Sequence, residues 1–252
     1  MRQVRVYSAE PLAPQCEHVL SRTATEHVAR VLRLRPGDPL VLFDGRGGEY
    51  AARLVRIERT AAIVATGRHL PVERESPLAI TLLQGLARGE KMDWIVQKAT
   101  ELGVAHIVPV NAGRSVARIA GADRADRKLE HWRAVAAAAC EQCGRNRLPV
   151  IDAPVALPAA LELAAAAGLR LLLTPEAQAE EEPAAALAAL ARSAGPSVAL
   201  LIGPEGGFEP AEIALATDHG FRGARLGPRV LRTETAAIAA IAALQALAGD
   251  LG

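Results

Sequence analysis

The chain has 252 residues, half of them hydrophobic and about a quarter charged, with a net charge of +1. This is the make-up of a folded globular protein with material for one large domain or two modest ones. No apolar run reaches the roughly 20 residues that a membrane-spanning helix needs, and the first ten residues lack the apolar segment of a signal peptide. Three cysteines are too few for a disulfide framework, so we expect a cytoplasmic protein without a membrane partner.

Positive charge is concentrated at the N-terminal end. Residues 1–70 contain eleven arginines, no lysine and seven acidic residues, whereas residues 71–252 contain 18 basic and 21 acidic residues. The planar guanidinium suits phosphates and stacked bases better than an ammonium does. On charge alone, a solvated charged surface remains the simpler interpretation.

The first 70 residues are predicted to form a small β-rich domain. One short helix should interrupt it, capped by Thr23 or Thr25 and burying Val28, Val31 and Leu32. The polar segment His69–Pro77 indicates a linker, which we place at residues 71–77. Apolar runs between turn-forming residues predict strands at Val4–Tyr7, Leu40–Phe43, Tyr50–Ile57 and Ala61–Thr66.

Residues 78–252 alternate apolar strands with longer helical patterns, which predicts an α/β domain with a parallel sheet covered on both faces. The last helix places apolar side chains three residues apart in an alanine background, so it should pack on the sheet or on a second subunit. Those side chains are Ile238, Ile241, Leu244 and Leu247. The strands are expected at Leu78–Leu83, His106–Val110, Leu169–Leu173, Val198–Ile202 and Ala224–Leu226, and the helices at Lys91–Leu102, Asp123–Cys143, Ala156–Ala167, Pro183–Ser193, Pro210–His219 and Glu234–Ala248.

A glycine-bearing loop, Gly203-Pro204-Glu205-Gly206-Gly207-Phe208, follows one of these strands and precedes a helix. Glycines at a strand end let the backbone approach a ligand, and ligands of α/β sheets bind beyond the carboxyl ends of the strands. The loop matches neither phosphate-binding fingerprint. A ligand site and a plain strand-to-helix turn are therefore about equally good interpretations.

A second loop, Leu226–Ala236, also lies between a strand and a helix. Thr233 is a plausible N-cap, and Glu234 would sit favourably in the first turn. Arg232 has no such structural explanation, because a cation at a helix N-terminus is unfavourable without a partner. Arg232 is therefore the strongest functional candidate in this loop.

Together the two loops resemble the 16S ribosomal RNA uracil-N3 methyltransferases, the ribosomal RNA small-subunit methyltransferase E family. Further segments agree in order and spacing, so the resemblance covers nearly the whole chain. The matching segments are HVARVLRLRPGD (27–38) with LFDGRGGEY (42–50), KMDWIVQKATELGV (91–104), EQCGRNRLP (141–149), GPEGGF (203–208) and LGPRVLRTETA (226–236).

This resemblance implies a fold and a set of partners. The expected fold is α/β, with a C-terminal SPOUT-class trefoil-knot domain (78–252) and an N-terminal PUA-like β-barrel (1–70) that binds RNA. The implied cofactor is S-adenosyl-L-methionine, and the implied partners are 16S ribosomal RNA, within the 30S subunit, and a second copy of the chain. No metal is implied. By the same resemblance the cofactor would be held by Thr174, Gly203, Glu205, Gly206, Gly207, Leu226, Gly227 and Leu231, with Pro175 beside Thr174.

The implied reaction needs two kinds of group. Uracil N3 carries a proton, so it becomes nucleophilic only when that proton leaves to a carboxylate or to water. The resulting charge on the two ring oxygens needs a cation or a donor. Our hypothesis is that Arg232 stabilises the uracil anion and that Glu234 orients the base or accepts its proton.

The RNA-contact candidates lie elsewhere in the chain. Arg30, Arg33 and Arg35 cluster near a helix end with His27, and they suit either phosphate contact or compensation of helix carbonyls. We favour phosphate contact and add Arg145, with Glu141 and Gln142 as weaker candidates for RNA or subunit contacts.

Other interpretations were weighed. Cys140 and Cys143 form a C-x-x-C pair without further zinc ligands or a thioredoxin-like context, so we expect no metal site and no functional dithiol. The alternative functions are a SPOUT ribose 2′-O methyltransferase and a non-catalytic RNA-binding assembly factor.

Overall fold

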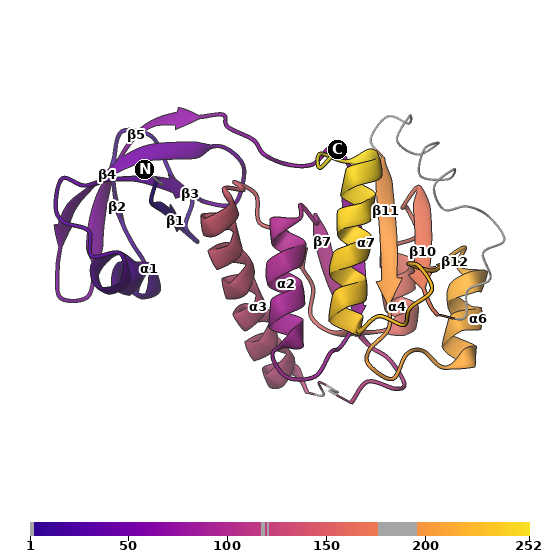
Figure 1. Cartoon of the computed structure of the whole chain (residues 1–252). Helices are drawn as coiled ribbons and strands as arrows, with labels where there is room; N and C mark the ends of the chain where they lie inside the picture. Colours follow the sequence, from indigo (N-terminus) through magenta and orange to yellow (C-terminus); the bar gives the residue numbers. More distant parts are fainter. Residues whose placement is uncertain (1–2, 117–118, 120, 176–195) are drawn as a thin grey trace. The chain divides into compact units, whose positions relative to one another are not determined.

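The computed structural model describes residues 3–116, 119, 121–175 and 196–252 (Figure 1). The chain divides into two compact units. The N-terminal unit combines Met1–Glu75 with Ala137–Leu148, and the C-terminal unit combines Ser76–Ala136 with Pro149–Gly252. Residues 71–75, predicted as linker, and residues 137–148, predicted in the second domain, thus belong to the first unit. The helix predicted at residues 183–193 lies outside the described residues.

The N-terminal unit is built on a five-stranded sheet in the order β1-β3-β4-β5-β2. β1 and β3 are parallel, and the other pairs are antiparallel. Inward side chains such as Leu42, Leu54 and Val64 form a single apolar core. Sequence patterning missed β2, which is three residues long and contains one apolar residue. The strands are β1 (Arg5–Tyr7), β2 (Glu17–Val19), β3 (Pro39–Phe43), β4 (Glu49–Ile57) and β5 (Ala62–Leu70).

The helical segment of this unit differs from its prediction. α1 (Arg22–Glu26) continues into the π-helical turn η1 (His27–Val31), and the N-cap is Ser21, whose side chain accepts from the Ala24 amide. The predicted Thr23 or Thr25 cap is therefore wrong. Val28 is buried as predicted, but Val31 is 68% exposed because η1 rotates it away from the core.

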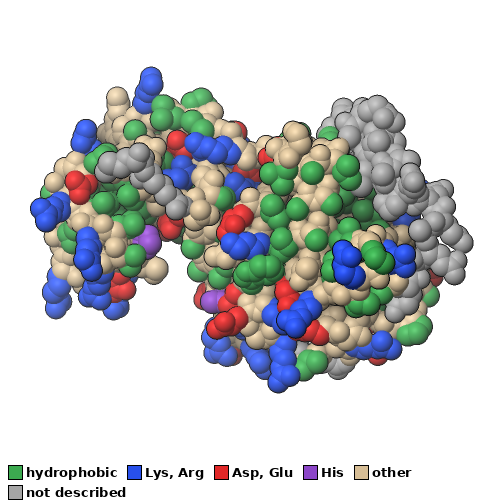
Figure 2. All heavy atoms as spheres, viewed as in Figure 1, with side chains coloured by type: hydrophobic (Ala, Val, Ile, Leu, Met, Phe, Trp, Pro, Cys, Tyr) green, Lys and Arg blue, Asp and Glu red, His purple; other side chains and the backbone are tan. Residues whose placement is uncertain are grey.

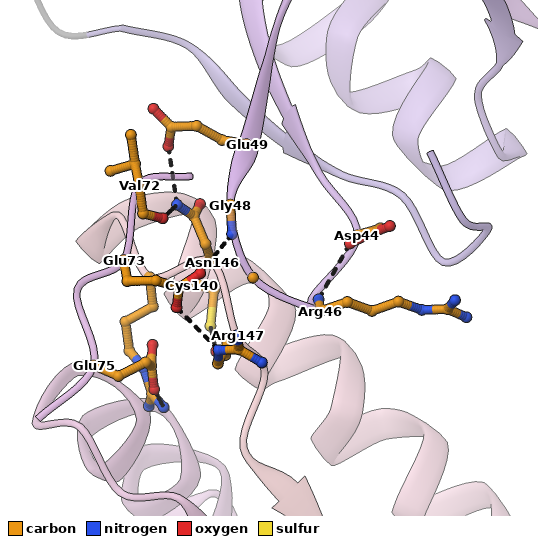
Figure 3. Close-up of polar contacts among 12 residues, drawn as sticks. Asp44, Arg46, Gly48, Glu49, Val72, Glu73, Glu75, Cys140, Asn146 and Arg147 are labelled. Carbon is orange, nitrogen blue, oxygen red and sulfur yellow. Dashed lines mark hydrogen bonds and ion pairs between the residues drawn. The ribbon is translucent and has the colours of Figure 1, made fainter. Parts of the chain in front are cut away.

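Buried polar contacts attach residues 137–148 to this unit (Figure 3). The Asn146 amide, which is fully buried, donates to Glu49 at 3.2 Å and to the Val72 carbonyl at 2.6 Å. Arg145 is 4% exposed and pairs with Glu75 at 2.5 Å. The segment 72–75 is thus held by hydrogen bonds and an ion pair, and it does not behave as a free linker.

The C-terminal unit contains a seven-stranded sheet in the order β12-β10-β11-β6-β7-β8, with β9 also paired to β7. Every pairing is parallel, as the alternation of strands and helices predicted. β8 and β9 have two residues each and were not predicted. The strands are β6 (Ala79–Gly85), β7 (His106–Asn111), β8 (Val150–Ile151), β9 (Val155–Ala156), β10 (Leu169–Leu173), β11 (Ser197–Ile202) and β12 (Arg222–Ala224).

Helices cover both faces of this sheet (Figure 1). α2 (Lys91–Glu101), α7 (Thr233–Ala248) and part of α3 (Ala122–Cys143) pack on one face. α4 (Leu157–Leu163) and α6 (Pro210–Asp218) pack on the other. α7 buries Ile241 and Leu244, as predicted, and leaves Leu247 59% exposed. None of the helices in the described ranges is both long and apolar enough to cross a membrane.

Candidate active site

A cavity of about 560 Å³ opens in the C-terminal unit where β10, β11 and β12 end. Because these strands are parallel, their carboxyl ends share one edge of the sheet, which is where α/β folds bind ligands. Three glycines and several apolar side chains form much of the wall. The lining residues are Lys91, Arg114, Leu173, Thr174, Pro175, Ile202, Gly203, Pro204, Glu205, Gly206, Gly207, Phe208, Ile213, Ala224, Arg225, Leu226, Arg229, Val230, Leu231, Arg232, Thr233 and Ala236.

The glycine loop between β11 and α6 forms one wall of the cavity. Gly207 has a φ of +68°, which favours glycine, and a Cβ placed on it would have no neighbour within 4 Å. On the opposite side of the loop, a Cβ on Gly85 would overlap the backbone nitrogen of Pro204. The end of β6 therefore packs against the loop at Pro204, while the loop backbone at Gly207 faces open space.

A buried hydrogen-bond chain connects this loop to the start of α7. The amide of Gln84, fully buried at the end of β6, donates to the Gly85 carbonyl and to Thr233 Oγ1, both at 2.9 Å. Thr233 Oγ1 in turn donates to the Gly203 carbonyl at 2.6 Å. The neutral Thr233 side chain thus links the start of α7 to the glycine loop, 30 residues earlier in the sequence.

The arginine-bearing loop between β12 and α7 forms a second wall. The helix begins at Thr233 and the N-cap is Arg232, with φ −64° and ψ 152°. The predicted Thr233 cap is wrong, because the Thr233 hydroxyl donates a hydrogen bond to the Gly203 carbonyl instead of capping the helix. Within the described residues, the exposed Arg232 side chain makes no hydrogen bond or ion pair. Its guanidinium is therefore available to a ligand in the cavity.

Lys91, at the start of α2, joins carboxylates from both loops. Its Nζ lies 3.0 Å from Glu205 and 3.3 Å from Glu234. The hydrogen bond that Lys91 donates to Glu205 raises the pKa of Lys91, with a smaller contribution from Glu234. Burial raises the pKa of Glu205, but its own amide, the Arg88 amide and Lys91 outweigh that effect, so its pKa is lowered. Both partners therefore stay charged near neutral pH.

The cavity brings together most of the residues singled out from the sequence. Gly227 and Glu234 do not line it. The Glu234 carboxylate is 14% exposed and engaged by Lys91, so it is placed to hold that ammonium and not to reach a base in the cavity. The predicted residues that line the cavity are Thr174, Gly203, Glu205, Gly206, Gly207, Leu226, Leu231 and Arg232.

Sequence reasoning missed several cavity residues. Lys91 belongs to a matching segment, but no role was assigned to it. Arg114 follows β7 and reaches the glycine loop, with its guanidinium 3.4 Å from the Gly206 carbonyl. Arg225 and Arg229 lie in the second loop itself. A basic residue following a strand end was the available signal for Arg114, whereas only the fold brings Lys91 to the other two loops.

The RNA-contact candidates lie in the N-terminal unit. Arg30, Arg33 and Arg35 are exposed and His27 is partly buried. Arg33 has a φ of +53°, an uncommon conformation for a non-glycine residue. Arg145 differs from the prediction, because burial and its pairing with Glu75 leave its guanidinium no route to a phosphate. We leave Arg145 out of the proposed RNA-contacting set.

The cysteine pair is reduced in the structure. Cys140 is buried at the end of α3, and a hydrogen bond with Cys143 together with burial raises the pKa of its thiol. A thiol with a raised pKa is a poor nucleophile. Over the described ranges, no three His, Cys, Asp or Glu side chains gather as metal ligands would.

Two family models identify the class of protein to which this α/β fold and its cavity belong, the RNA methyltransferases. The RNA methyltransferase domain family matches residues 74–245, and the RNA methyltransferase PUA domain family matches residues 20–66. The chain belongs to the ribosomal RNA small subunit methyltransferase E family. This confirms the resemblance and the predicted fold class, a SPOUT-type α/β domain with an N-terminal PUA-like domain.

Individual relatives agree over most of their length. The ribosomal RNA small subunit methyltransferase E of Mycobacterium tuberculosis is 35% identical over 226 residues, which cover 88% of this chain and 83% of the relative. A putative methyltransferase of Legionella pneumophila, solved with the bound cofactor S-adenosylmethionine, superimposes with a TM-score of 0.90 at 40% identity over 100% of both chains. The family member of Neisseria gonorrhoeae, bound to S-adenosylmethionine, gives 0.86 at 33% identity, also over 100% of both chains.

Proposed function

We propose that this protein uses S-adenosylmethionine to methylate N3 of a uracil in 16S ribosomal RNA. The observation that carries the proposal is the cavity that the glycine loop and the arginine-bearing loop line together at the carboxyl edge of the sheet. The proposal includes the assembled 30S subunit as substrate, a homodimer as the working form and the cytoplasm as the location.

The residues of the cavity fit the cofactor. Its volume lies within the range of small-molecule sites. Open backbone at Gly207 gives donors and acceptors for a polar ring edge, and apolar side chains such as Ile202 and Leu226 suit the ring faces. A cation at the rim suits the carboxylate of the methionine moiety. The bound cofactor would supply a methyl group on a positively charged sulfur.

The protein's own contribution is charge placed beside the target base. Arg232 projects from the helix start with its guanidinium unpaired among the described residues, so it can donate to the ring oxygens as negative charge spreads onto them. Lys91 is paired with Glu205 and Glu234, so the unpaired positive charge beside the ring comes from Arg232. Positive charge near the ring makes the N3 proton easier to lose.

The surroundings of the two nearby carboxylates, Glu205 and Glu234, indicate what accepts the N3 proton. Glu234 is engaged by Lys91 and does not line the cavity, so we assign it the positioning of Lys91. Glu205 lines the cavity, but its lowered pKa makes it a weak base. We therefore propose that the N3 proton leaves to water and that the positive charge of Arg232 supplies most of the assistance.

The experiment is methylation of 30S subunits purified from cells that lack this enzyme, followed by mass spectrometry of the nucleosides. 3-Methyluridine is the expected product. A ribose-methylated nucleoside would replace the proposal with 2′-O methylation. Absence of S-adenosylmethionine binding in calorimetry would replace it with a non-catalytic assembly factor.

Arg232 is tested separately in the same assay. Arg232→Ala should still fold and bind the cofactor in calorimetry, while kcat falls roughly 100-fold, as expected when a donor to a developing anion is lost. Arg133→Ala, an exposed arginine on α3 that does not line the cavity, is the matched control. A near wild-type kcat for Arg232→Ala would remove Arg232 from the reaction.

A further inference from the structure

The rim of the cavity carries much more positive than negative charge. Among the described residues that line it, five side chains are basic and one, that of Glu205, is acidic. Lys91 is neutralised by the two glutamates that it contacts. The four arginines make no ion pair with an acidic side chain in the described part of the chain. Arg225, Arg229 and Arg232 are exposed and make no side-chain ion pair or hydrogen bond with the described part of the chain, and exposed Arg114 reaches the Gly206 carbonyl.

This local excess contrasts with the rest of the protein. Elsewhere some exposed arginines are paired with acids, as Arg56 is with Glu17 and Glu58, and Arg147 is with Glu73, while others, such as Arg127 and Arg133 on α3, make no ion pair with the described residues. Residues 71–252 as a whole contain more acidic than basic residues. Figure 2 shows Lys and Arg side chains gathered over the segment between β12 and α7. Unpaired arginines on two adjoining loops repel one another and are stabilised by an anion.

The cofactor cannot be the anion that balances this rim. S-adenosylmethionine has a sulfonium and an ammonium group, both positive, and a single carboxylate. One arginine satisfies that carboxylate, and a second can serve the target base. At least two arginines then have no partner in the proposed chemistry.

We propose that Arg225 and Arg229 hold the phosphates that flank the target nucleotide, so that the C-terminal unit has an RNA-binding surface of its own at the cavity mouth. This inference rests on the proposed function. A base reaches such a cavity only when it leaves its stack, and the strand that carries it has a phosphate on each side. Both arginines come from the β12–α7 loop, which lines the cavity.

The partner is an exposed, unpaired stretch of RNA and not a duplex. Exposed arginines contact single-stranded backbone by charge and can also stack on splayed bases. A ligand held by charge predicts a measurable salt dependence, because each neutralised phosphate of a single strand contributes roughly 0.7 to the slope of log affinity against log salt.

The test compares wild type with Arg225→Ala/Arg229→Ala in binding of a fluorescent single-stranded RNA over a salt series. We expect about tenfold weaker binding at low salt and a slope smaller by roughly 1.4, from two lost contacts. Arg225→Lys/Arg229→Lys, which keeps the charges, should recover most of the slope. Arg127→Ala/Arg133→Ala removes the same charge from exposed positions of α3 away from the cavity and should change the slope less.

Three results would overturn the proposal. The slope could stay unchanged in the Arg225/Arg229 variant, the control variant could lose as much affinity, or poly-glutamate could displace the RNA from wild type as well as unlabelled RNA does. The last result would indicate a general anion surface. Calorimetric binding of S-adenosylmethionine is measured for every variant, and Arg127→Ala/Arg133→Ala, which does not alter the cavity lining, should bind it like wild type. A wild type that binds no cofactor but shows the predicted RNA slopes would refute the proposed function and leave the RNA surface standing.

Discussion

The hydroxyl of Thr233 lies 2.6 Å from the carbonyl oxygen of Gly203 and donates a hydrogen bond to it. The same hydroxyl accepts from Gln84, whose side chain is fully buried. The two loops that line the cavity therefore share one small polar anchor, and Arg232 is the residue immediately before it. The position of the Arg232 guanidinium therefore depends on the hydrogen bonds that its neighbour Thr233 makes with Gly203 and Gln84.

Replacing Thr233 by valine tests this anchor. Valine keeps the shape but leaves the Gly203 carbonyl and the Gln84 amide unpaired, at a cost of about 1–3 kcal/mol for buried groups. We expect S-adenosylmethionine to bind roughly tenfold more weakly, which calorimetry measures. Thr233→Ser retains the hydroxyl and should bind like wild type. Equal affinities for the valine and serine variants would show that the anchor does not shape the cofactor site.

Replacing Arg33 by glycine separates stability from RNA binding. The φ of +53° costs an ordinary side chain about 1–2 kcal/mol, and glycine avoids that cost while adding about 0.5–1 kcal/mol of chain entropy. Arg33→Gly should therefore be as stable as wild type or slightly more stable in urea unfolding, yet bind RNA several-fold more weakly. Gln15→Gly, with φ 56°, is the matched control and should leave RNA binding intact. Unchanged RNA affinity in Arg33→Gly would assign Arg33 a purely conformational role.

Two nearby arginines of one loop should differ sharply in their effect on stability. Arg145 is almost fully buried and pairs with Glu75, whose side chain is 24% exposed, so its removal should cost up to the roughly 3–5 kcal/mol that breaking a buried pair costs. The side chain of Arg147 is 53% exposed beside Glu73, and its removal should cost about 0–1 kcal/mol. Thermal unfolding of Arg145→Ala and Arg147→Ala measures the difference. Similar losses in both variants would contradict the burial of Arg145.

Glu49 should make the N-terminal unit sensitive to acid. Burial raises its pKa, but hydrogen bonds from Arg5 and Asn146 and the charge of Arg5 outweigh burial, so its pKa lies below the ordinary 4.5. Ionised Glu49 therefore stabilises the folded unit above pH 4.5, and this contribution disappears as the pH falls through the lowered pKa.

Glu49→Gln should remove that dependence. At pH 7 the variant should be less stable by about 1–3 kcal/mol, and its stability should change less between pH 5 and pH 3. Hydrogen exchange of the β4 amides at each pH reports on this unit. Glu17→Gln, whose side chain is 54% exposed, is the control and should retain the wild-type pH profile. An acid profile in Glu49→Gln as steep as that of wild type would contradict this account.

The elements that sequence predicted best are those whose environment repeats along the chain. β6, β7, β10 and β11 are buried on both faces and therefore form continuous apolar runs, which sequence patterns reveal. Strands of two or three residues, such as β2 and β8, carry too few positions for a pattern.

The site was predictable where its residues are contiguous. The two loops each follow a strand, so their glycines and Arg232 could be located from sequence. Lys91 was not assigned because its carboxylate partners are more than 100 residues away and meet it only in the folded chain. Arg145 was misinterpreted for the same reason, since Glu75 lies 70 residues earlier. Charge in a sequence does not distinguish a solvated arginine from one that is buried with a distant acid.

The N-terminal unit consists of two separate segments of the chain, and this affects the order in which it can fold during synthesis. Residues 1–75 leave the ribosome well before residues 137–148. Glu49 and Glu75 therefore lack their partners Asn146 and Arg145 while the intervening part of the other unit is being synthesised. A fragment that ends at residue 75 would leave the carboxylates of Glu49 and Glu75 without those partners. Excision of the N-terminal unit as an independent module therefore requires a graft of the 137–148 peptide, and a simple C-terminal deletion should yield an unstable product.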